Sequence, residues 1–262
     1  MNFELKLIIF IGRHLPRIPH ITGLINRLLK PWYLRKKREE VVVDVFDFKM
    51  KLNPAEGVDG GMLFYPHLYE PDEVDFLKKQ LKSGDIFLDA GANIGFYSLI
   101  ASKLVGNDGL VLAVEADPYN CEKLAFNSEL NNLTNIRVLN LGLSDKRETL
   151  RLGLNTIGNR GTNSFLIDSP DGVDVACYPL DYVLKDSKID KISVAKFDIE
   201  GFEFRVLKAF FYEVDSTFYP KSIIIEHHPE GTAKAGGDAL ELLKSKGYKI
   251  YAKHGYNYLM ML

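Results

Sequence analysis

The sequence predicts an α/β fold in which a doubly wound parallel sheet carries the functional site. The first observation is a short apolar strand over residues 86–89 that passes through a glycine turn into a helix from Phe96. The second is the repeat of this unit, with a buried strand over 110–115 and a helix over 118–131. The third is a later strand over 193–198 that also leads into a helix. Strands that alternate with helices are typical of a parallel sheet covered on both faces.

The turn after the first strand indicates a ligand that lies close to the backbone. Gly91 permits a positive φ, and the missing Cβ atoms of Gly91 and Gly95 allow N–H groups to approach a ligand. The spacing fits neither the G-x-G-x-x-G dinucleotide fingerprint nor the phosphate loop, which requires a lysine. Asp89 at the edge of this turn favours a cationic ligand over a pyrophosphate. The turn therefore predicts a ligand with an ammonium group, such as the methionine end of S-adenosylmethionine.

A second acid ends the next strand. Glu115 follows the apolar run over 110–114 and precedes Ala116 and Asp117-Pro118, which open the next helix. A carboxylate at this position can accept hydrogen bonds from two ribose hydroxyl groups. Sites for NAD and for S-adenosylmethionine share this feature, and the glycine turn favours the latter.

Three segments together carry a resemblance to a known family. They are DAGANIGFYS over 89–98, EADPYNCEKLAFNSELNNL over 115–133 and KFDIEGFEFRVLKA over 196–209. From about residue 68 to residue 207 the chain resembles the FkbM family of S-adenosylmethionine-dependent methyltransferases. The resemblance implies a seven-stranded class I methyltransferase fold whose last strand is antiparallel. It also implies O-methylation of a hydroxyl group on a sugar, glycan, polyketide or other small molecule.

The expected cofactor site collects residues from four loops. A Tyr-Glu pair ahead of the helix over 71–81 is a family feature, although an acid in a first helical turn is an equally good interpretation of Glu70. Residues 140–143 follow the third strand, where the adenine would lie, and the alternative is a plain turn. The candidates are Glu70, Asp89, Gly91, Asn93, Gly95, Glu115, Ala116, Asn140, Gly142 and Leu143.

The strand over 193–198 and the next strand, over 222–226, supply the candidate bases. Asp198 and Glu200 end the first of these strands beside the topological switch point, where ligands bind in doubly wound sheets. His227 follows the second strand and ranks third. Lys196 is expected to pack its stem and extend its ammonium group to water. We expect no metal ion, because adjacent histidines on a strand point to opposite faces.

A long polar loop over 155–172 is the candidate lid over the acceptor. Loops of this length inside a compact domain are usually functional or mobile. Arg160, Asn163 and Ser164 can bond sugar hydroxyl groups, as can Thr162. A loop that is simply solvated is an equally good interpretation.

Elements at the two ends complete the expected domain. We assign residues 1–66 to an N-terminal extension, with a cap helix and a hairpin that pairs 41–50 with 51–63, and residues 67–262 to the catalytic domain. A short helix over 179–184, a helix over 235–246 and strands over 248–252 and 256–262 fill the latter.

The N-terminal extension leaves two interpretations open. Its apolar run over 5–11 is too short to span a bilayer. Basic and apolar residues within 1–38 favour either a helix that caps the catalytic domain with a solvated basic face or a peripheral contact with an anionic membrane.

Composition limits the class of protein. The chain has 262 residues, 46% of them apolar, which is enough for a full core, and its net charge of −2 gives no sign of a nucleic-acid partner. Two distant cysteines indicate a reducing, cytoplasmic setting rather than a disulfide framework. A non-catalytic scaffold and an NAD-linked oxidoreductase are the alternatives to a methyltransferase, and the acceptor and oligomeric state stay open.

Overall fold

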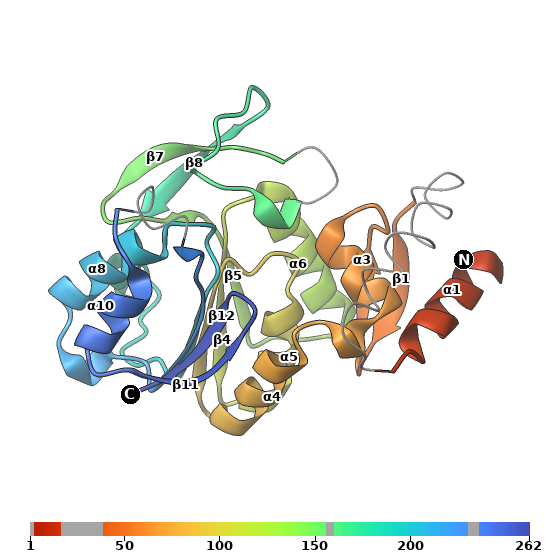
Figure 1. Cartoon of the computed structure of the whole chain (residues 1–262), viewed down its shortest axis with the longest axis horizontal. Helices are drawn as coiled ribbons and strands as arrows, with labels where there is room; N and C mark the ends of the chain where they lie inside the picture. The colour runs from red at the N-terminus through yellow and green to blue at the C-terminus, as the bar shows by residue number, and fades with distance from the viewer. Residues whose placement is uncertain (1–2, 17–38, 156–159, 230–235) are drawn as a thin grey trace. The chain divides into compact units, whose positions relative to one another are not determined.

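The computed structural model describes residues 3–16, 39–155, 160–229 and 236–262. The chain forms two compact units (Figure 1). The first, called the N-terminal unit, comprises residues 1–71 with 155–161, and the second, called the sheet unit, comprises 72–154 with 162–262.

Among its described residues, the N-terminal unit contains two helices, a hairpin and a short 3-10 turn. They are α1 (Phe3–Arg13), β1 (Val41–Val45), β2 (Phe48–Leu52), α3 (Gly57–Phe64) and η1 (Pro66–Leu68). Helix α1 shows that the N-terminal extension is helical near its start, while its expected role as a cap on the catalytic domain stays a prediction. Most of the basic segment expected to contact either the domain or a membrane, residues 17–38, lies outside the described residues.

The expected hairpin between 41–50 and 51–63 is wrong in its extent. The strands meet at a two-residue turn, Phe46-Asp47, and residues 57–64 form a helix instead of a strand. The side chain of Asp59 accepts a hydrogen bond from the Asn53 N–H group (2.5 Å), which ties this helix to the end of β2. A Cβ atom on Gly61 would lie 2.8 Å from the ring of Tyr69. Tertiary packing thus outweighs the low helix propensity of glycine.

The sheet unit is built on seven strands in the order β11-β12-β10-β9-β3-β4-β5. β12 runs antiparallel to both of its neighbours, β10 and β11, and the other pairs in this sheet are parallel, which confirms the expected sheet and its terminal hairpin. The strands are β3 (Ile86–Ala90), β4 (Leu110–Glu115), β5 (Ile136–Asn140), β9 (Val194–Phe197), β10 (Ser222–Glu226), β11 (Lys249–His254) and β12 (Asn257–Met261).

Helices flank this sheet and bury its central strands. Strands β3, β4, β9 and β10 read as nearly continuous apolar runs, as expected where both faces are covered. The helices are α4 (Pro71–Gln80), α5 (Phe96–Val105), α6 (Pro118–Leu130), α7 (Leu180–Asp186), α8 (Glu203–Glu213), η3 (Ser216–Phe218) and α10 (Ala239–Ser245).

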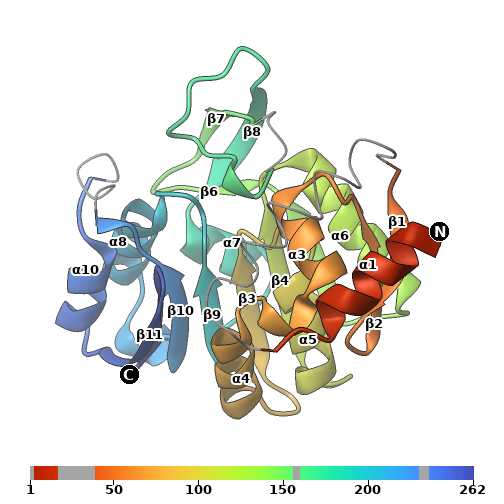
Figure 2. The same ribbon diagram turned by 45° about the vertical axis from the view of Figure 1, so that its right-hand side comes forward.

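A second, three-stranded sheet stands apart from the first within the sheet unit (Figure 2). Its order is β6-β8-β7, with β6 (Gly142–Leu143), β7 (Glu148–Leu152) and β8 (Val173–Tyr178). The polar loop between β7 and β8 contains the short helix η2 (Arg160–Thr162) and a bridge between Gly153 and Ser164. The carboxyl ends of β3, β4 and β9 meet at one edge of the large sheet, as parallel pairing requires.

Candidate active site

Asp89 lies one residue before the end of β3, and one of its two carboxylate oxygens has no hydrogen-bond partner among the described residues. The side chain is 1% exposed, and its Oδ2 atom accepts a hydrogen bond from the Ser98 hydroxyl (2.6 Å). Its Oδ1 atom is buried and has no hydrogen-bond partner among the described residues. Burial raises the pKa of Asp89, and the charge of Lys196 opposes that shift. A buried acceptor without a donor is costly, so this oxygen is a candidate ligand contact.

The glycine turn after β3 lies directly against the end of β9. Gly91 has a φ of 78°, and a Cβ atom added there would lie 1.8 Å from the carbonyl oxygen of Asp198. The Asp198 N–H group donates to the carbonyl of Ala90 (3.1 Å), which holds the two segments together. Gly91 therefore serves the close approach of two backbone segments as well as the turn itself.

Glu115 joins the turn to the end of β4. Its Oε2 atom accepts from the Asn93 N–H group (2.7 Å) and its Oε1 atom from the Asp117 N–H group (2.8 Å). Burial raises the pKa of Glu115 to about 7; the two N–H groups oppose this shift, whereas the charges of Asp117 and Asp89 add to it. Each carboxylate oxygen has capacity for a second donor. The carboxyl groups of Asp89 and Glu115 thus lie on neighbouring strands and are close enough for the charge of one to shift the pKa of the other.

The segment expected to face the adenine is partly engaged in packing. The Asn140 side-chain amide donates to the carbonyls of Glu115 (2.9 Å) and Ala116 (3.3 Å). Gly142 and Leu143 form β6, and a Cβ atom on Gly142 would lie 2.6 Å from Sγ of Cys177. The structure therefore brings Asn140 to the Glu115 loop and places Gly142 against β8.

Three carboxyl groups gather at the ends of β9 and β10, and we call Asp198, Glu200 and Glu226 the acid cluster. One carboxylate oxygen of each lies within 4.8 Å of the others, a spacing that a hard cation can use. The ammonium group of Lys196 lies 2.7 Å from Oδ2 of Asp198, so a positive charge is already present. Parallel pairing of β9 with β10 aligns Phe197 with Ile225 and brings Glu226 opposite Asp198.

The acid cluster has strongly divergent acidities. Burial acts to raise the pKa of Asp198, but the charge and hydrogen bond of Lys196 hold it below its ordinary value. Burial and the charge of Asp198 raise the pKa of Glu200 to about 8 and that of Glu226 to about 9. A hydrogen bond joins Glu226 to Asp198. At neutral pH Asp198 is therefore the ionised member, and Glu226 carries a proton.

Two expectations for this region need correction. Lys196 does not extend to water, because its side chain is 6% exposed and its ammonium group pairs with Asp198. His227 does not face the acid cluster: its Nε2 atom lies 3.7 Å from Asp238, and its ring packs edge-on against Tyr258. Its neighbour His228 lies beside the acid cluster, with Nε2 3.3 Å from Oε1 of Glu226.

Both corrections follow from a spacing that was visible in the sequence. Lys196 and Asp198, like Glu226 and His228, are two residues apart at a strand or its end, which puts each pair on one face.

Glu203 holds the loop between β9 and α8 in place. Its carboxylate accepts hydrogen bonds from the N–H groups of Ile199 (2.8 Å) and Gly201 (3.0 Å). Burial raises the pKa of Glu203 to about 7.

Part of the polar loop is hydrogen-bonded to the loops at this edge of the sheet. The Asn163 amide donates to Oδ2 of Asp117 (2.8 Å), and the Ser164 hydroxyl donates to the carbonyl of Glu200 (2.7 Å). The ring of Phe165 lies 5.2 Å from that of Phe202. Residues 163–165 therefore link the β4 loop to the β9 loop.

Two other candidates lie in the N-terminal unit. The backbone N–H group of Arg160 donates to the carboxylate of Glu56 (3.0 Å) within that unit. Glu70 has a left-handed backbone (φ 44°) just before α4. Of the expected acceptor residues, the sheet unit thus brings together Asn163 and Ser164.

Comparison with known proteins gives a consistent match over this region. A family model described as the methyltransferase FkbM domain matches residues 89–250. Hexuronic acid methyltransferase AglP of Haloferax volcanii is 26% identical over 159 residues, which cover 61% of this chain and 62% of that protein. The match thus spans about three fifths of the length of this curated relative.

Solved structures resemble the chain as well. Methyltransferase FkbM from Methylobacillus flagellatus KT matches with a TM-score of 0.50 and 19% identity, covering 78% of this chain and 52% of that one. A putative rRNA-methylase from Clostridium thermocellum matches with a TM-score of 0.44 and 15% identity, covering 72% and 92%. The first of these likenesses supports the class I fold seen in the seven-stranded sheet.

Proposed function

Because the chain belongs to the FkbM methyltransferase family, we propose that it transfers a methyl group from S-adenosylmethionine to a hydroxyl oxygen of a sugar or glycan. The name of its curated relative concerns hexuronic acid, so uronic-acid-containing sugars are the first acceptors to test. The wrong glycine spacing for a dinucleotide argues against a nicotinamide-linked enzyme.

The main support for S-adenosylmethionine as the cofactor is the Oδ1 atom of Asp89, which has no hydrogen-bond partner among the described residues. A buried carboxylate oxygen without a donor would be stabilised by an ammonium group, which S-adenosylmethionine has. The second lone pairs on the Glu115 oxygens suit the two ribose hydroxyl groups. Gly91 (φ 78°) and Gly95 (φ 95°) adopt the left-handed backbone that the turn requires, while Asn93, Ala116 and Asn140 complete the proposed contacts. The described residues therefore fit this cofactor.

The acid cluster is the proposed catalytic machinery. S-adenosylmethionine, when bound, supplies a methyl group that is already activated for transfer, so the chain's remaining tasks are alignment and removal of a proton. Asp198 is the preferred base because Lys196 keeps it ionised at neutral pH. The acceptor O–H group would pass its proton to a carboxylate oxygen of Asp198. Glu200, whose pKa of about 8 leaves it mostly protonated at pH 7, is the alternative.

The hydrogen-bonded part of the polar loop is proposed to line the acceptor side. Asn163 and Ser164 each donate a hydrogen bond to a neighbouring loop, so they would hold this part of the polar loop in place beside the acceptor.

Isothermal titration calorimetry tests the cofactor assignment. The wild-type protein is expected to bind S-adenosylmethionine and S-adenosylhomocysteine, and not NAD. Asp89→Asn removes the buried charge while keeping the shape, and we expect about tenfold to a hundredfold weaker binding of both ligands. Asp85→Asn, at the opposite end of β3, is the matched control, because its carboxylate bonds only the Lys82 N–H group and the Ser193 hydroxyl in the described contacts.

Binding of NAD alone would end the methyltransferase proposal, and binding of none of the three would favour a scaffold. The acceptor is sought separately by mass spectrometry, as a uronic-acid-containing glycan that gains a methyl group in the presence of the protein.

A further inference from the structure

Helix α1 is apolar on the face that packs and also on the face that meets solvent. The packed face carries Leu5, Ile8, Ile9 and Gly12, all buried. It lies against α3, and a Cβ atom on Gly12 would be only 2.2 Å from the carbonyl oxygen of Phe64. This close contact fixes which face of α1 points outward.

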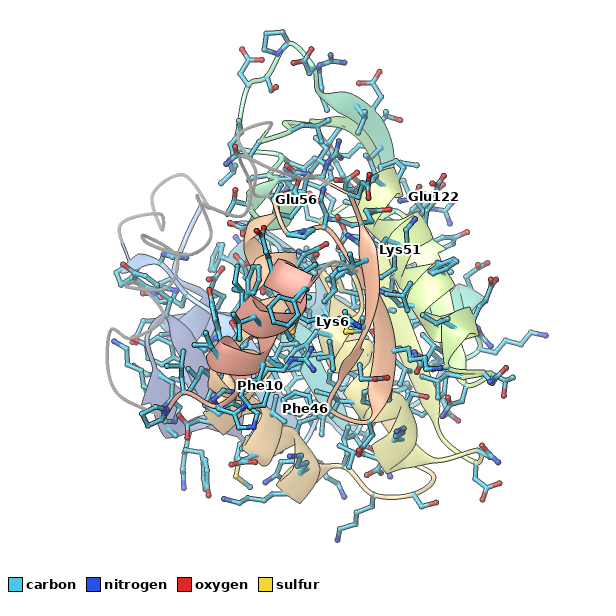
Figure 3. All side chains as sticks on the ribbon, turned by 90° about the vertical axis from the view of Figure 1, so that its right-hand side faces the viewer. Lys6, Phe10, Phe46, Lys51, Glu56 and Glu122 are labelled. Carbon is cyan, nitrogen blue, oxygen red and sulfur yellow. The ribbon has the colours of Figure 1, made fainter. Side chains whose placement is uncertain are left out.

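The outward face consists of large apolar side chains. Phe3 is 78% exposed, Phe10 61%, Leu7 47% and Ile11 42%. Phe3, Leu7 and Phe10 follow the i, i+4, i+7 spacing, so they form one stripe along the helix. Figure 3 looks onto this part of the N-terminal unit, with Lys6 and Phe10 labelled on α1.

The stripe is not the usual surface of a soluble helix, whose solvent face is polar. Phe46, at the tip of the β1–β2 hairpin in the same unit, is a further large apolar side chain that is 48% exposed. Contiguous exposed apolar groups rimmed by charge mark an interaction surface. Lys6, exposed at the flank of the stripe, is long enough to keep its ammonium group in a polar layer while the aromatic rings are buried.

The distribution of charged residues along the sequence indicates what kind of surface the outward face of α1 binds. Residues 1–38 contain nine lysines and arginines and a single acid, Glu4. The remaining 224 residues contain 24 basic and 34 acidic residues, so the positive charge is concentrated around α1 in the sequence. A surface that attracts this end and repels the rest must be anionic and must accept apolar side chains. An anionic lipid bilayer has both properties.

We propose that the outward face of α1 docks the protein on the surface of an anionic membrane, with the helix lying in the plane of the interface. Eleven residues at about 1.5 Å per residue give a helix of about 16 Å, roughly half the hydrocarbon thickness. None of the helices among the described residues is long and apolar enough to cross a bilayer. The contact is therefore peripheral, and it is separate from methyl transfer.

Co-sedimentation of the full chain with vesicles tests this proposal. Vesicles of phosphatidylcholine mixed with phosphatidylglycerol are compared with vesicles of phosphatidylcholine alone. The wild-type protein is expected to pellet with the anionic vesicles and to be released by high salt. The triple variant Phe3→Ser, Leu7→Ser, Phe10→Ser is expected to bind them at least about tenfold more weakly, since these side chains no longer enter the interface.

A matched triple variant controls for a general loss of surface hydrophobicity. Phe126→Ser, Tyr212→Ser, Ile250→Ser changes three exposed apolar side chains of the sheet unit and is expected to pellet like the wild-type protein. Three results would overturn the proposal: no pelleting with either vesicle, equal pelleting of both triple variants, or a wild-type dimer that the α1 variant converts to a monomer without any vesicle binding. The last result would assign the face to self-association. Cofactor titration is unaffected in every case, so the two proposals fail independently.

Discussion

The contact between the glycine turn and the end of β9 can be tested by adding one methyl group. Gly91→Ala places a Cβ atom 1.8 Å from the carbonyl oxygen of Asp198. Gly84→Ala is a matched control, because Gly84 has a similar φ (84° against 78°) and a Cβ atom there meets nothing within 4 Å. Both variants put an alanine in a left-handed backbone conformation, but only in Gly91→Ala does the new Cβ atom collide with another atom.

The expected magnitudes follow from these two terms. A left-handed backbone costs an alanine about 1–2 kcal/mol at either position. At Gly91 the Asp198 carbonyl must also retreat by about 1.2 Å to reach the 3.0 Å below which real Cβ contacts are essentially never seen. Such overpacking adds about 1–3 kcal/mol. For a chain of this size we expect Tm to fall by roughly 5–15 °C in Gly91→Ala and by roughly 2–6 °C in Gly84→Ala.

Thermal melts and activity are measured on both variants. Because the displaced carbonyl belongs to Asp198 itself, Gly91→Ala is expected to lower turnover by about a hundredfold, the usual consequence of misplacing a catalytic group by an ångström. Gly84→Ala is expected to keep wild-type turnover. If both variants melt at the same temperature and turn over equally, the glycine turn does not contact the end of β9, and Gly91 does not position Asp198.

Two further predictions concern the acid cluster. Asp198→Asn is expected to keep affinity for S-adenosylmethionine within a few-fold and to lower turnover by about a hundredfold or more, measured by titration and steady-state kinetics. Unchanged turnover, or a wild-type rate that rises through pH 8 with the ionisation of Glu200, would move the role of base to Glu200. Glu226→Gln tests the raised pKa of Glu226. The folded-state pKa of about 9 lies above the ordinary value of 4.5, so the wild-type protein loses stability as pH rises between them, whereas glutamine does not titrate. In melts at about pH 5 and about pH 9, the variant should gain a few degrees over the wild-type protein at the higher pH only. An equal difference at both pH values would contradict the shift.

Features encoded within one short stretch were predictable from the sequence. The strand ending on Asp89, the turn at Gly91 and the helix from Phe96 depend on apolar runs and glycine placement, and the structure confirms them as β3 and α5. Glu115 at the end of β4 was predictable for the same reason, because the parallel units repeat. The seven-stranded sheet with an antiparallel last strand was instead implied by the family resemblance, and the structure confirms it.

Features that depend on pairing between distant strands were not predictable from the sequence. Glu226 meets Asp198 only because β10 pairs with β9 in the register that aligns Phe197 with Ile225. No local pattern fixes that register, so the sequence could place Glu226 at a strand end but not beside a particular acid. Helix α3 was missed because Gly60 and Gly61 favour a turn, whereas in the structure Gly61 lies within the helix and against the ring of Tyr69, where there is no room for a Cβ atom.

The raised pKa values of the carboxyl groups at this edge of the sheet have one physical origin. Burial raises the pKa of Asp89, Glu115, Glu200 and Glu226, and Lys196 is the ammonium group that opposes several of these shifts. Holding so many carboxyl groups together costs folding free energy whenever they ionise. A cation that enters the site relieves this repulsion, and a neutral or anionic ligand of similar shape does not. The edge therefore selects for positive charge, which is the property that distinguishes a sulfonium nucleoside from a dinucleotide.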